Sequence, residues 1–326
     1  MEQSDAGLPD DPRAIHVALP LGIGDCHWVV TKLRALSVYH DGAPIYTYTG
    51  TSPNHKTDGY LSICPQVTEA RYSAQAPKGL WGEIDNPNHR DIHWASLKNC
   101  ANWRTFTYVL QANGHLEASR PLRTFLPELD ECGGTEFEYA PRITDAERAR
   151  AATLGGAHPV IVYTAGVGPN AGFQNHQFGV DHWVEVCERL VALGLTPVLC
   201  GANNKDDLRY RDWLVRKLAR YKLPFLDTTG QTSIPEYCAL IESARVWIGF
   251  NSGGGIVSAM RRTPTVMLWS DSTYPITGVH ELTVLPPAMQ RSWLTDEQLT
   301  TYRTLSFGSP ELTPAAVVAK AMEVIR

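Results

Sequence analysis

A glycine-rich turn between a predicted strand and a predicted helix is the first place where this sequence suggests chemistry. Residues 246–250 form a short apolar run with β-branched and aromatic side chains, which indicates a buried strand. The turn, NSGGG over residues 251–255, precedes a helix predicted from Ile256. Backbone N–H groups and the positive end of a helix dipole bind phosphates at such turns, where glycine permits close approach and positive φ. An ordinary strand-to-helix turn is the alternative.

Asp25 is a carboxylate at a comparable position in the first half of the chain. It follows a strand predicted over residues 15–19 and a glycine loop over residues 20–25, and it precedes a helix predicted over residues 26–39. This position suits a helix N-cap, whose side-chain oxygen accepts a backbone hydrogen bond. It also suits a general base at the mouth of a cleft. The two roles compete for the same oxygens, and both remain open at this point.

The composition indicates a globular protein with more than one domain. The chain has 326 residues, with 43% hydrophobic and 19% charged residues, which suffices for two domains with their own cores. The formal net charge of −5 provides no overall basic field for nucleic acid. A local basic groove remains compatible with it.

The cysteines and the apolar segments indicate a cytoplasmic protein. The seven cysteines are odd in number and contain no CxxC pair, which disfavours a disulfide framework or a zinc site. The polar, acidic first 13 residues lack the features of a signal peptide. No window of 18 apolar residues is present, so no membrane-spanning segment is expected.

Strands and helices alternate in the second half, which predicts an α/β fold with parallel sheets. Ligands of such sheets bind beyond the carboxyl ends of the strands, where both Thr164 and Asn251 are expected. A capping box, Thr144 with Glu147, opens a predicted helix near a domain junction at residues 140–158. The expected domains are Rossmann-like over residues 1–145 and 146–310, followed by a C-terminal helix over residues 311–326. Two such domains across a cleft resemble the GT-B architecture.

Residues 74–127 have weak periodicity and are rich in aromatic, histidine and asparagine side chains. A buried irregular region and a polar, aromatic acceptor pocket are both consistent with this composition. Basic side chains in the same half form an ordinary solvated face in the simpler interpretation, and they could alternatively line a groove. They are Lys56, Lys78, Arg90, Lys98, Arg104, Arg120 and Arg123.

Several short segments together resemble the family 9 glycosyltransferases, the heptosyltransferases of lipopolysaccharide assembly. The resemblance rests on the order and spacing of the segments, since each alone is weakly specific. In chain order they are LGIGD at 21–25 with LRAL at 33–36, TAG at 164–166 with Phe178 and Trp183, LCG at 199–201, TGQTS at 229–233, NSG at 251–253 and PTV at 264–266.

The resemblance implies a GT-B fold, in which the Rossmann-like domain 1–145 binds the acceptor and the Rossmann-like domain 146–310 binds the nucleotide-sugar donor. It also implies a role for each matching residue. The family's general base matches Asp25, and its diphosphate-binding threonine or serine matches Thr164. The turn that flanks the nucleobase matches Gln231 and Thr232. The implied donor-binding set is Gly22, Gly24, Thr164, Gly166, His176, Gly201, Gln231, Thr232, Asn251, Ser252, Gly253 and Gly254.

Three positions depart from the family pattern. His176 lies on or near the position of a phosphate-loop lysine, so a permanent positive charge becomes titratable. Asn251 and Ile256 replace an aspartate and a histidine of the family's DSGxxH loop. A nucleotide-diphosphate sugar is therefore expected as the donor, without heptose being implied as its sugar.

The chemistry that these residues offer requires no metal or other cofactor. Backbone N–H groups at residues 164–168 and 251–255, with His176, would stabilise the departing diphosphate, and Asp25 would take the acceptor's proton. No DxD pair that would hold Mg²⁺ against a diphosphate is evident.

Three functions fit the sequence. The first is a glycosyltransferase acting on a lipopolysaccharide-type saccharide. The second is a bacteriophage-type glycosyltransferase acting on a modified DNA base, for which the basic residues would form the groove. The third, supported by the departures at Asn251 and Ile256, is a catalytically silent protein that binds nucleotide sugars.

Overall fold

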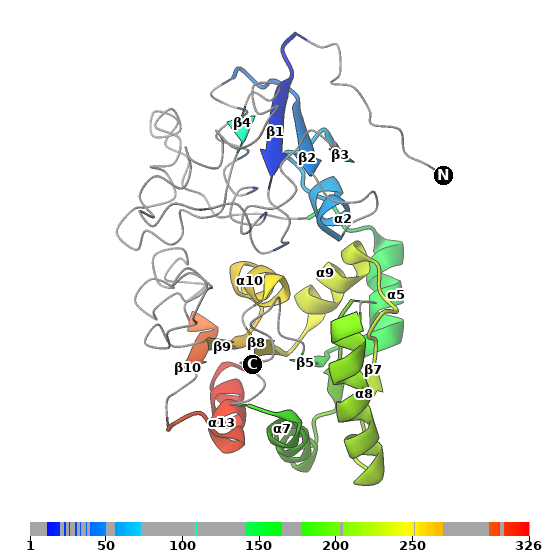
Figure 1. The fold of residues 1–326 in the computed structure, drawn as a ribbon, viewed down its shortest axis with the longest axis vertical. Coiled ribbons are helices and arrows are strands. Elements are labelled where there is room, and N and C mark those ends of the chain that lie inside the picture. Colours follow the sequence, from blue (N-terminus) through cyan, green and yellow to red (C-terminus); the bar gives the residue numbers. More distant parts are fainter. Residues whose placement is uncertain are drawn as a thin grey trace. The chain divides into compact units, whose positions relative to one another are not determined.

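The computed structural model describes two compact units of the chain, Met1–Arg142 and Ile143–Arg326 (Figure 1). The residues described are 12–19, 23, 26, 30, 33, 37, 40–49, 56–72, 108–109, 141–164, 178–202, 205–250, 252–269, 300–306 and 310–325. Each unit contains its own parallel sheet with helices, so the predicted α/β fold is confirmed. This division does not assign acceptor or donor binding to either unit, and those roles stay predictions.

The first unit is built on a sheet with strand order β3-β2-β1-β4. Its strands are β1 (Ile15–Leu19), β2 (Ile45–Thr49), β3 (Glu69–Tyr72) and β4 (Tyr108–Val109), and the helix α2 (Lys56–Ser62) connects β2 to β3. All three pairings are parallel. Ile15, Val17 and Ile45 are buried, as the alternating apolar pattern of these strands requires.

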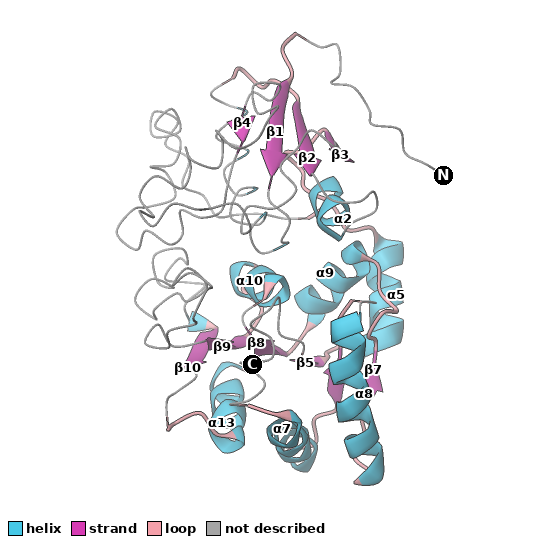
Figure 2. Ribbon diagram, viewed as in Figure 1, coloured by secondary structure: helices cyan, strands magenta, loops and turns pink. Residues whose placement is uncertain are grey.

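The second unit contains a sheet with strand order β10-β9-β8-β5-β6-β7, in which every pairing is parallel (Figure 2). Its strands are β5 (Val160–Tyr163), β6 (Pro197–Leu199), β7 (Leu226–Asp227), β8 (Val246–Phe250), β9 (Thr265–Trp269) and β10 (Tyr302–Ser306). Its helices are α5 (Asp145–Gly155), α7 (Val180–Ala192), α8 (Lys205–Arg220), α9 (Ile234–Ser243), α10 (Gly253–Met260) and α13 (Pro314–Val324).

Both faces of this sheet are covered by helices, with α7 and α13 on one side and α9 and α10 on the other (Figure 1). The side of α7 and α13 holds the main core, where Trp183 packs edge-on against Phe178 at 5.0 Å and against Phe250 at 5.3 Å between ring centroids. Because successive side chains of a strand point to opposite faces, Tyr163, Trp247 and Gly249 face the opposite side, toward α9 and α10.

Side-chain caps fix where several of these helices begin. The Thr144 hydroxyl accepts a hydrogen bond from the backbone N–H of Glu147, and the backbone N–H of Thr144 donates to the Glu147 carboxylate. The predicted capping box of α5 is therefore confirmed. Ser233 and Glu236 form the same box at α9. Thr313 caps α13 through the N–H of Ala316.

Several expected boundaries are wrong. The apolar sequence LPFL at residues 223–226 predicts a strand, but the strand is observed only at Leu226–Asp227. The preceding residues leave α8 through a turn in which Lys222 has a φ of 54°. Ile23, expected in a loop, is helical. The expected start of α10 at Ile256 is also wrong, since the helix already begins at Gly253. The edge strand β10 was not anticipated, because its sequence, YRTLS, carries little apolar signal.

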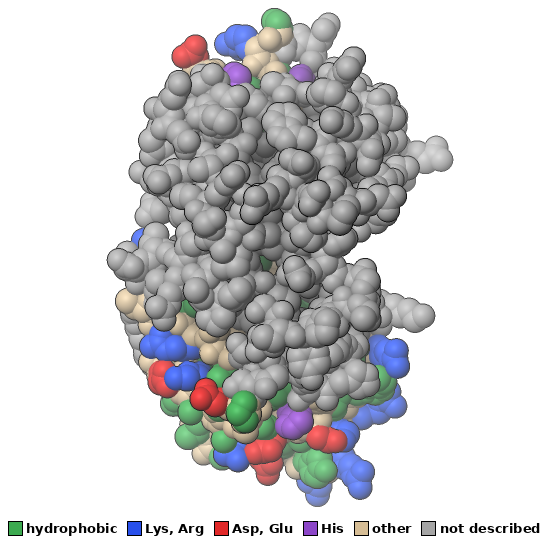
Figure 3. Space-filling model, turned by 60° about the vertical axis from the view of Figure 1, so that its left-hand side comes forward, with side chains coloured by type: hydrophobic (Ala, Val, Ile, Leu, Met, Phe, Trp, Pro, Cys, Tyr) green, Lys and Arg blue, Asp and Glu red, His purple; other side chains and the backbone are tan. Residues whose placement is uncertain are grey.

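The surface and the cysteines of the described residues are unremarkable for a globular protein. Basic and acidic side chains are interspersed over the described part of the face in Figure 3. The cysteines that the structure describes, Cys26, Cys64, Cys187, Cys200 and Cys238, are free and buried. Among the described helices, none is long and apolar enough to cross a membrane.

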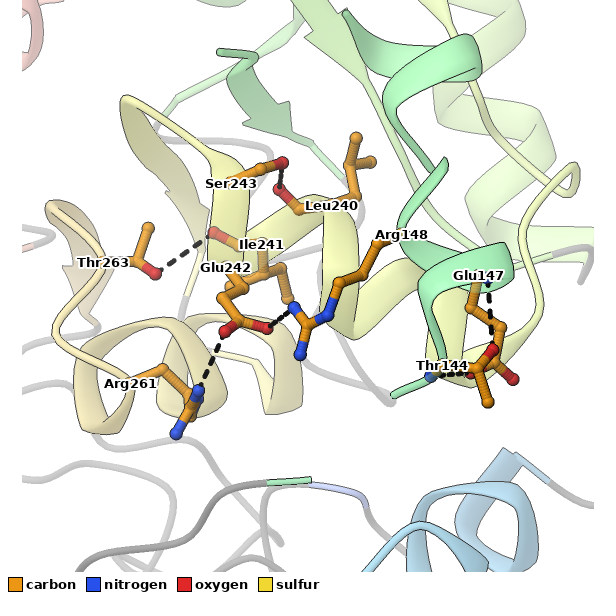
Figure 4. A network of polar contacts seen from close by, with 9 residues as sticks. All are labelled: Thr144, Glu147, Arg148, Leu240, Ile241, Glu242, Ser243, Arg261 and Thr263. Atoms are coloured by element: carbon orange, nitrogen blue, oxygen red, sulfur yellow. Dashed lines mark hydrogen bonds and ion pairs between the residues drawn. The ribbon is translucent and has the colours of Figure 1, made fainter. Parts of the chain in front are cut away.

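A carboxylate joins three helices on the α9 side of the second sheet (Figure 4). Glu242, near the end of α9, lies 2.5 Å from Arg148 of α5 and 3.1 Å from Arg261, which follows α10. The Thr263 hydroxyl donates to the carbonyl of Ile241 beside it. Glu242 therefore holds α10 and α5 against the same end of α9.

We expect Glu242→Gln to lower the free energy of unfolding by about 1 kcal/mol, because a partly exposed carboxylate loses two cations at once. The matched control is Glu185→Gln, which removes an exposed i,i+4 pair with Arg189 and should cost about 0.3–0.5 kcal/mol. Chemical denaturation of both variants measures the difference. Equal losses in the two variants would show that Glu242 does not join the helices energetically.

Candidate functional site

The carboxyl ends of four neighbouring strands meet at one edge of the second sheet. The order β8-β5-β6-β7 places the segments that follow these strands next to one another. Tyr163 pairs with Gly249, and Val162 pairs with Leu199, so the same register continued by two residues brings Thr164 beside Gly201. Thr164 is buried and Gly201 is partly exposed. This edge is where ligands of open parallel sheets bind.

The glycine turn after β8 forms the N-terminus of α10. The Ser252 hydroxyl caps the helix by accepting from the N–H of Gly255 at 3.4 Å, and the Ser252 carbonyl accepts from the N–H of Ile256. The N–H groups of Gly253 and Gly254 have no acceptor among the described residues. These two donors, with the helix dipole, suit an anion.

The glycines of this turn are required by close packing. A Cβ on Gly255 would lie 2.6 Å from Met267 and 2.8 Å from Trp247, and a Cβ on Gly254 would lie 2.1 Å from the hydroxyl of Tyr237. The expectation of positive φ is wrong for Gly254 and Gly255, because both lie inside the right-handed helix. The turn therefore has glycine because large neighbouring side chains leave no room for others.

The turn after β7 lies beside the end of β6. The N–H of Gly230 donates to the Gly201 carbonyl at 3.0 Å, and the Thr228 hydroxyl donates to the Leu199 carbonyl at 2.9 Å. Gly230 has a φ of 71°, which side-chain-bearing residues rarely adopt. Gln231 donates its amide hydrogen to the carbonyl of Asp227, so this part of its side chain stabilises the turn.

Asp227 and Thr229 give this turn its charge and polarity. The Asp227 carboxylate accepts from the N–H of Thr229 at 3.0 Å and from Arg211 at 2.6 Å, which compensates its charge. The Thr229 hydroxyl is buried and has no hydrogen-bond partner among the described residues. A buried hydroxyl without a partner costs about 1–3 kcal/mol, and an added ligand atom is one way to satisfy it.

The structure describes part of the expected site. The described members are Thr164, Gly201, Gln231, Thr232, Ser252, Gly253 and Gly254, and the strand order brings their segments to one edge. The expected residues outside the described part of the chain are Gly22, Gly24, Asp25, Gly166, His176 and Asn251. No group of three or more His, Cys, Asp or Glu side chains that could hold a metal ion is found within the described residues.

Two aromatic residues at this edge were not anticipated as site residues. Tyr237 projects from the first half of α9 onto Gly254, and Trp247 lies in β8 beneath Gly255. The sequence signal that points to them is the run of three glycines at a helix start, because glycine weakens a helix unless a neighbour occupies the side-chain space.

Comparisons with known proteins agree with this geometry. Residues 131–289 match the model of glycosyltransferase family 9 (heptosyltransferase). The fold is similar to E. coli ADP-heptose lipopolysaccharide heptosyltransferase II, at 17% identity and a TM-score of 0.61 over 96% of this chain and 98% of that one. It is also similar to a family 9 glycosyltransferase from Veillonella parvula, at 12% identity and a TM-score of 0.61 over 98% and 99% of the two chains.

A third similar structure is E. coli heptosyltransferase WaaC with ADP, at 10% identity and a TM-score of 0.54 over 95% of this chain and 99% of that one. At such identities the structural matches show the fold alone. The glycosyltransferase activity is supported by the match to the family model. No curated protein sequence matches the chain. The chain is therefore a glycosyltransferase with a GT-B fold, and its residues 131–289 are similar to the family 9 (heptosyltransferase) domain.

Proposed function

We propose that this glycosyltransferase moves a sugar from a nucleotide-diphosphate sugar to an acceptor hydroxyl without a metal ion. The observation that carries the proposal is the shared edge of β8, β5, β6 and β7, where the α10 N-terminus and the turn after β7 border the same sheet end. An anion-binding helix terminus and a polar turn suit the two parts of a nucleotide-diphosphate sugar.

The diphosphate is proposed to bind at α10 and at the end of β5. Its negative charge increases as the sugar departs, so hydrogen-bond donors fixed in advance lower the barrier. The N–H groups of Gly253 and Gly254 supply such donors, and Ser252 is held beside them as the helix cap. Thr164 contributes a buried hydroxyl at the end of the neighbouring strand.

The nucleoside is proposed to lie against the turn of residues 227–232. The Thr229 hydroxyl lacks a partner among the described residues and is the group best suited to accept or donate a hydrogen bond there. Gly201 and Gly230 are joined by a backbone hydrogen bond and present no side chain, so a ribose or base can approach the main chain. Thr232 is partly exposed beside them.

Asp25 is proposed as the general base that removes the acceptor's proton. This role rests on its match to the family's GxGD segment, because Asp25 lies outside the described residues. The proposed acceptor is a lipopolysaccharide-type saccharide, in keeping with the heptosyltransferase description of the matching family model. The free, buried cysteines are typical of a reducing compartment, which supports a cytoplasmic enzyme.

Among ADP-, UDP-, GDP- and CDP-sugars, we expect one nucleotide to stabilise the protein clearly more than the others. A ligand present at 100 times its Kd stabilises a folded protein by about 2.7 kcal/mol, which is visible as a shift in Tm. Differential scanning fluorimetry with EDTA present measures this shift. If none of these compounds raised the Tm, donor binding would be refuted. If the Tm rose only after a metal ion was added, the proposed metal independence would be refuted.

We expect Asp25→Asn to fold normally and to lower turnover by about 100- to 10,000-fold, because the amide cannot accept the acceptor's proton. The measurement is nucleotide release with the donor identified above, together with the Tm. The matched control is Asp145→Asn, which removes an exposed carboxylate from the first turn of α5 and should leave turnover unchanged.

Full turnover in Asp25→Asn would remove this residue from the mechanism, and loss of folding would assign it to helix capping. The acceptor is tested separately. Transfer to a lipopolysaccharide-type saccharide supports the proposal, whereas transfer to DNA with salt-dependent retention would favour the modified-base alternative.

A further inference from the structure

Tyr237 lies at the edge of the second sheet where the donor is proposed to bind, and the proposed function gives it no role. Its phenol hydroxyl lies where a side chain at Gly254 would be, 2.1 Å from an ideal Cβ, whereas the ring carbon that bears the hydroxyl lies at 3.1 Å. The hydroxyl therefore reaches the first turn of α10, beside the N–H groups of Gly253 and Gly254. Because Cβ bonds in a helix tilt toward the N-terminus, this is the ligand-facing end of the turn.

The surroundings of Tyr237 keep its phenol protonated. Burial raises the pKa of Tyr237 well above its ordinary value of 10, and the neighbouring Cys200 and Tyr163 raise it further. Cys200 follows β6 and Tyr163 ends β5, so these neighbours also place the phenol at the carboxyl edge of the sheet. Because its pKa is raised, the phenol is neutral near pH 7 and has a proton to donate.

The proton of Tyr237 has no acceptor among the described residues. The indole N–H of Trp247 acts on the phenol oxygen and opposes part of its pKa shift, although the indole nitrogen falls outside hydrogen-bonding geometry. Trp247 is fully buried, so its N–H is a second unsatisfied donor next to the same turn. Donors gathered at a helix N-terminus without an acceptor indicate that an anion completes the arrangement.

We propose that the Tyr237 hydroxyl donates a hydrogen bond to a phosphate oxygen of the donor's diphosphate at the N-terminus of α10. This rests on the proposed function, because it names a further residue of the same donor site. A phenylalanine would fill the same space beside Gly254 but would offer no oxygen to the Trp247 indole N–H and no proton to a ligand. Tyr237 is partly buried, so the proton of its hydroxyl is available to a ligand atom at this turn.

The geometry itself is tested by Gly254→Ala, whose methyl group would meet the Tyr237 hydroxyl. Overpacking of this kind lowers the midpoint of thermal unfolding by roughly 2–10 °C. In the double variant with Tyr237→Phe the offending oxygen is gone, so we expect most of the loss to be recovered. If the double variant melted at the sum of the two single effects, the contact between Tyr237 and Gly254 would be refuted.

The proposal is tested with Tyr237→Phe, which keeps the ring. The probes are whichever of ADP, UDP, GDP and CDP binds the wild type most tightly, and the corresponding nucleoside, each titrated by calorimetry. Hydrogen bonds to charged groups contribute about 1.5–3 kcal/mol, so we expect the Kd for the diphosphate to rise about 10- to 150-fold. The Kd for the nucleoside and the Tm should stay at the wild-type values.

The matched control is Tyr221→Phe, an exposed tyrosine after α8, which should change neither Kd. Unchanged diphosphate binding by Tyr237→Phe would overturn the proposal, and equal weakening of diphosphate and nucleoside would overturn it as well, because the loss would then come from the shape of the whole site. Failure of the wild type to bind any of the four diphosphates would refute the proposed function itself. The two failures are therefore distinguishable.

Discussion

The parallel pairing of β8, β5, β6 and β7 is the constraint on which the rest of the candidate site depends. Parallel strands end at the same edge, so the pairing itself brings together four segments that are distant in sequence. The hydrogen bond from Gly230 to Gly201 then joins two of these segments directly. The pairing is supported on one face by the core around Trp183 and Phe250 and on the other by α9 and α10. A site at this edge therefore inherits the rigidity of a sheet buried on both faces.

The turn at α10 satisfies two physical demands at once. In the proposed function its backbone must remain open to an anion, and its helix must pack closely on β8 and α9. Glycine at residues 254 and 255 meets both, because Tyr237, Trp247 and Met267 occupy the space that side chains there would need. The proposed binding of a phosphate at this turn would thus be coupled to the packing of α9, which Glu242 in turn fixes to α5 and α10.

The sequence predicted those parts of the fold that depend on local signals. The strands at residues 15–19 and 246–250 agree with the structure because apolar runs specify buried parallel strands, and the capping box at Thr144 agrees because capping is local. The edge strand β10 and the contact between Tyr237 and Gly254 depend on tertiary packing. The run of three glycines indicates that a neighbour fills their side-chain space, but it does not identify that neighbour, so the role of the glycines was attributed to backbone freedom instead of to space.

The most direct test of the account is a crystal structure of the protein with the nucleoside diphosphate that binds it most tightly. The account predicts phosphate oxygens within about 2.7–3.2 Å of the N–H groups of Gly253 and Gly254, with the nucleoside against the turn of residues 227–232. Phosphates bound elsewhere, with the α10 N-terminus exposed to water alone, would contradict it.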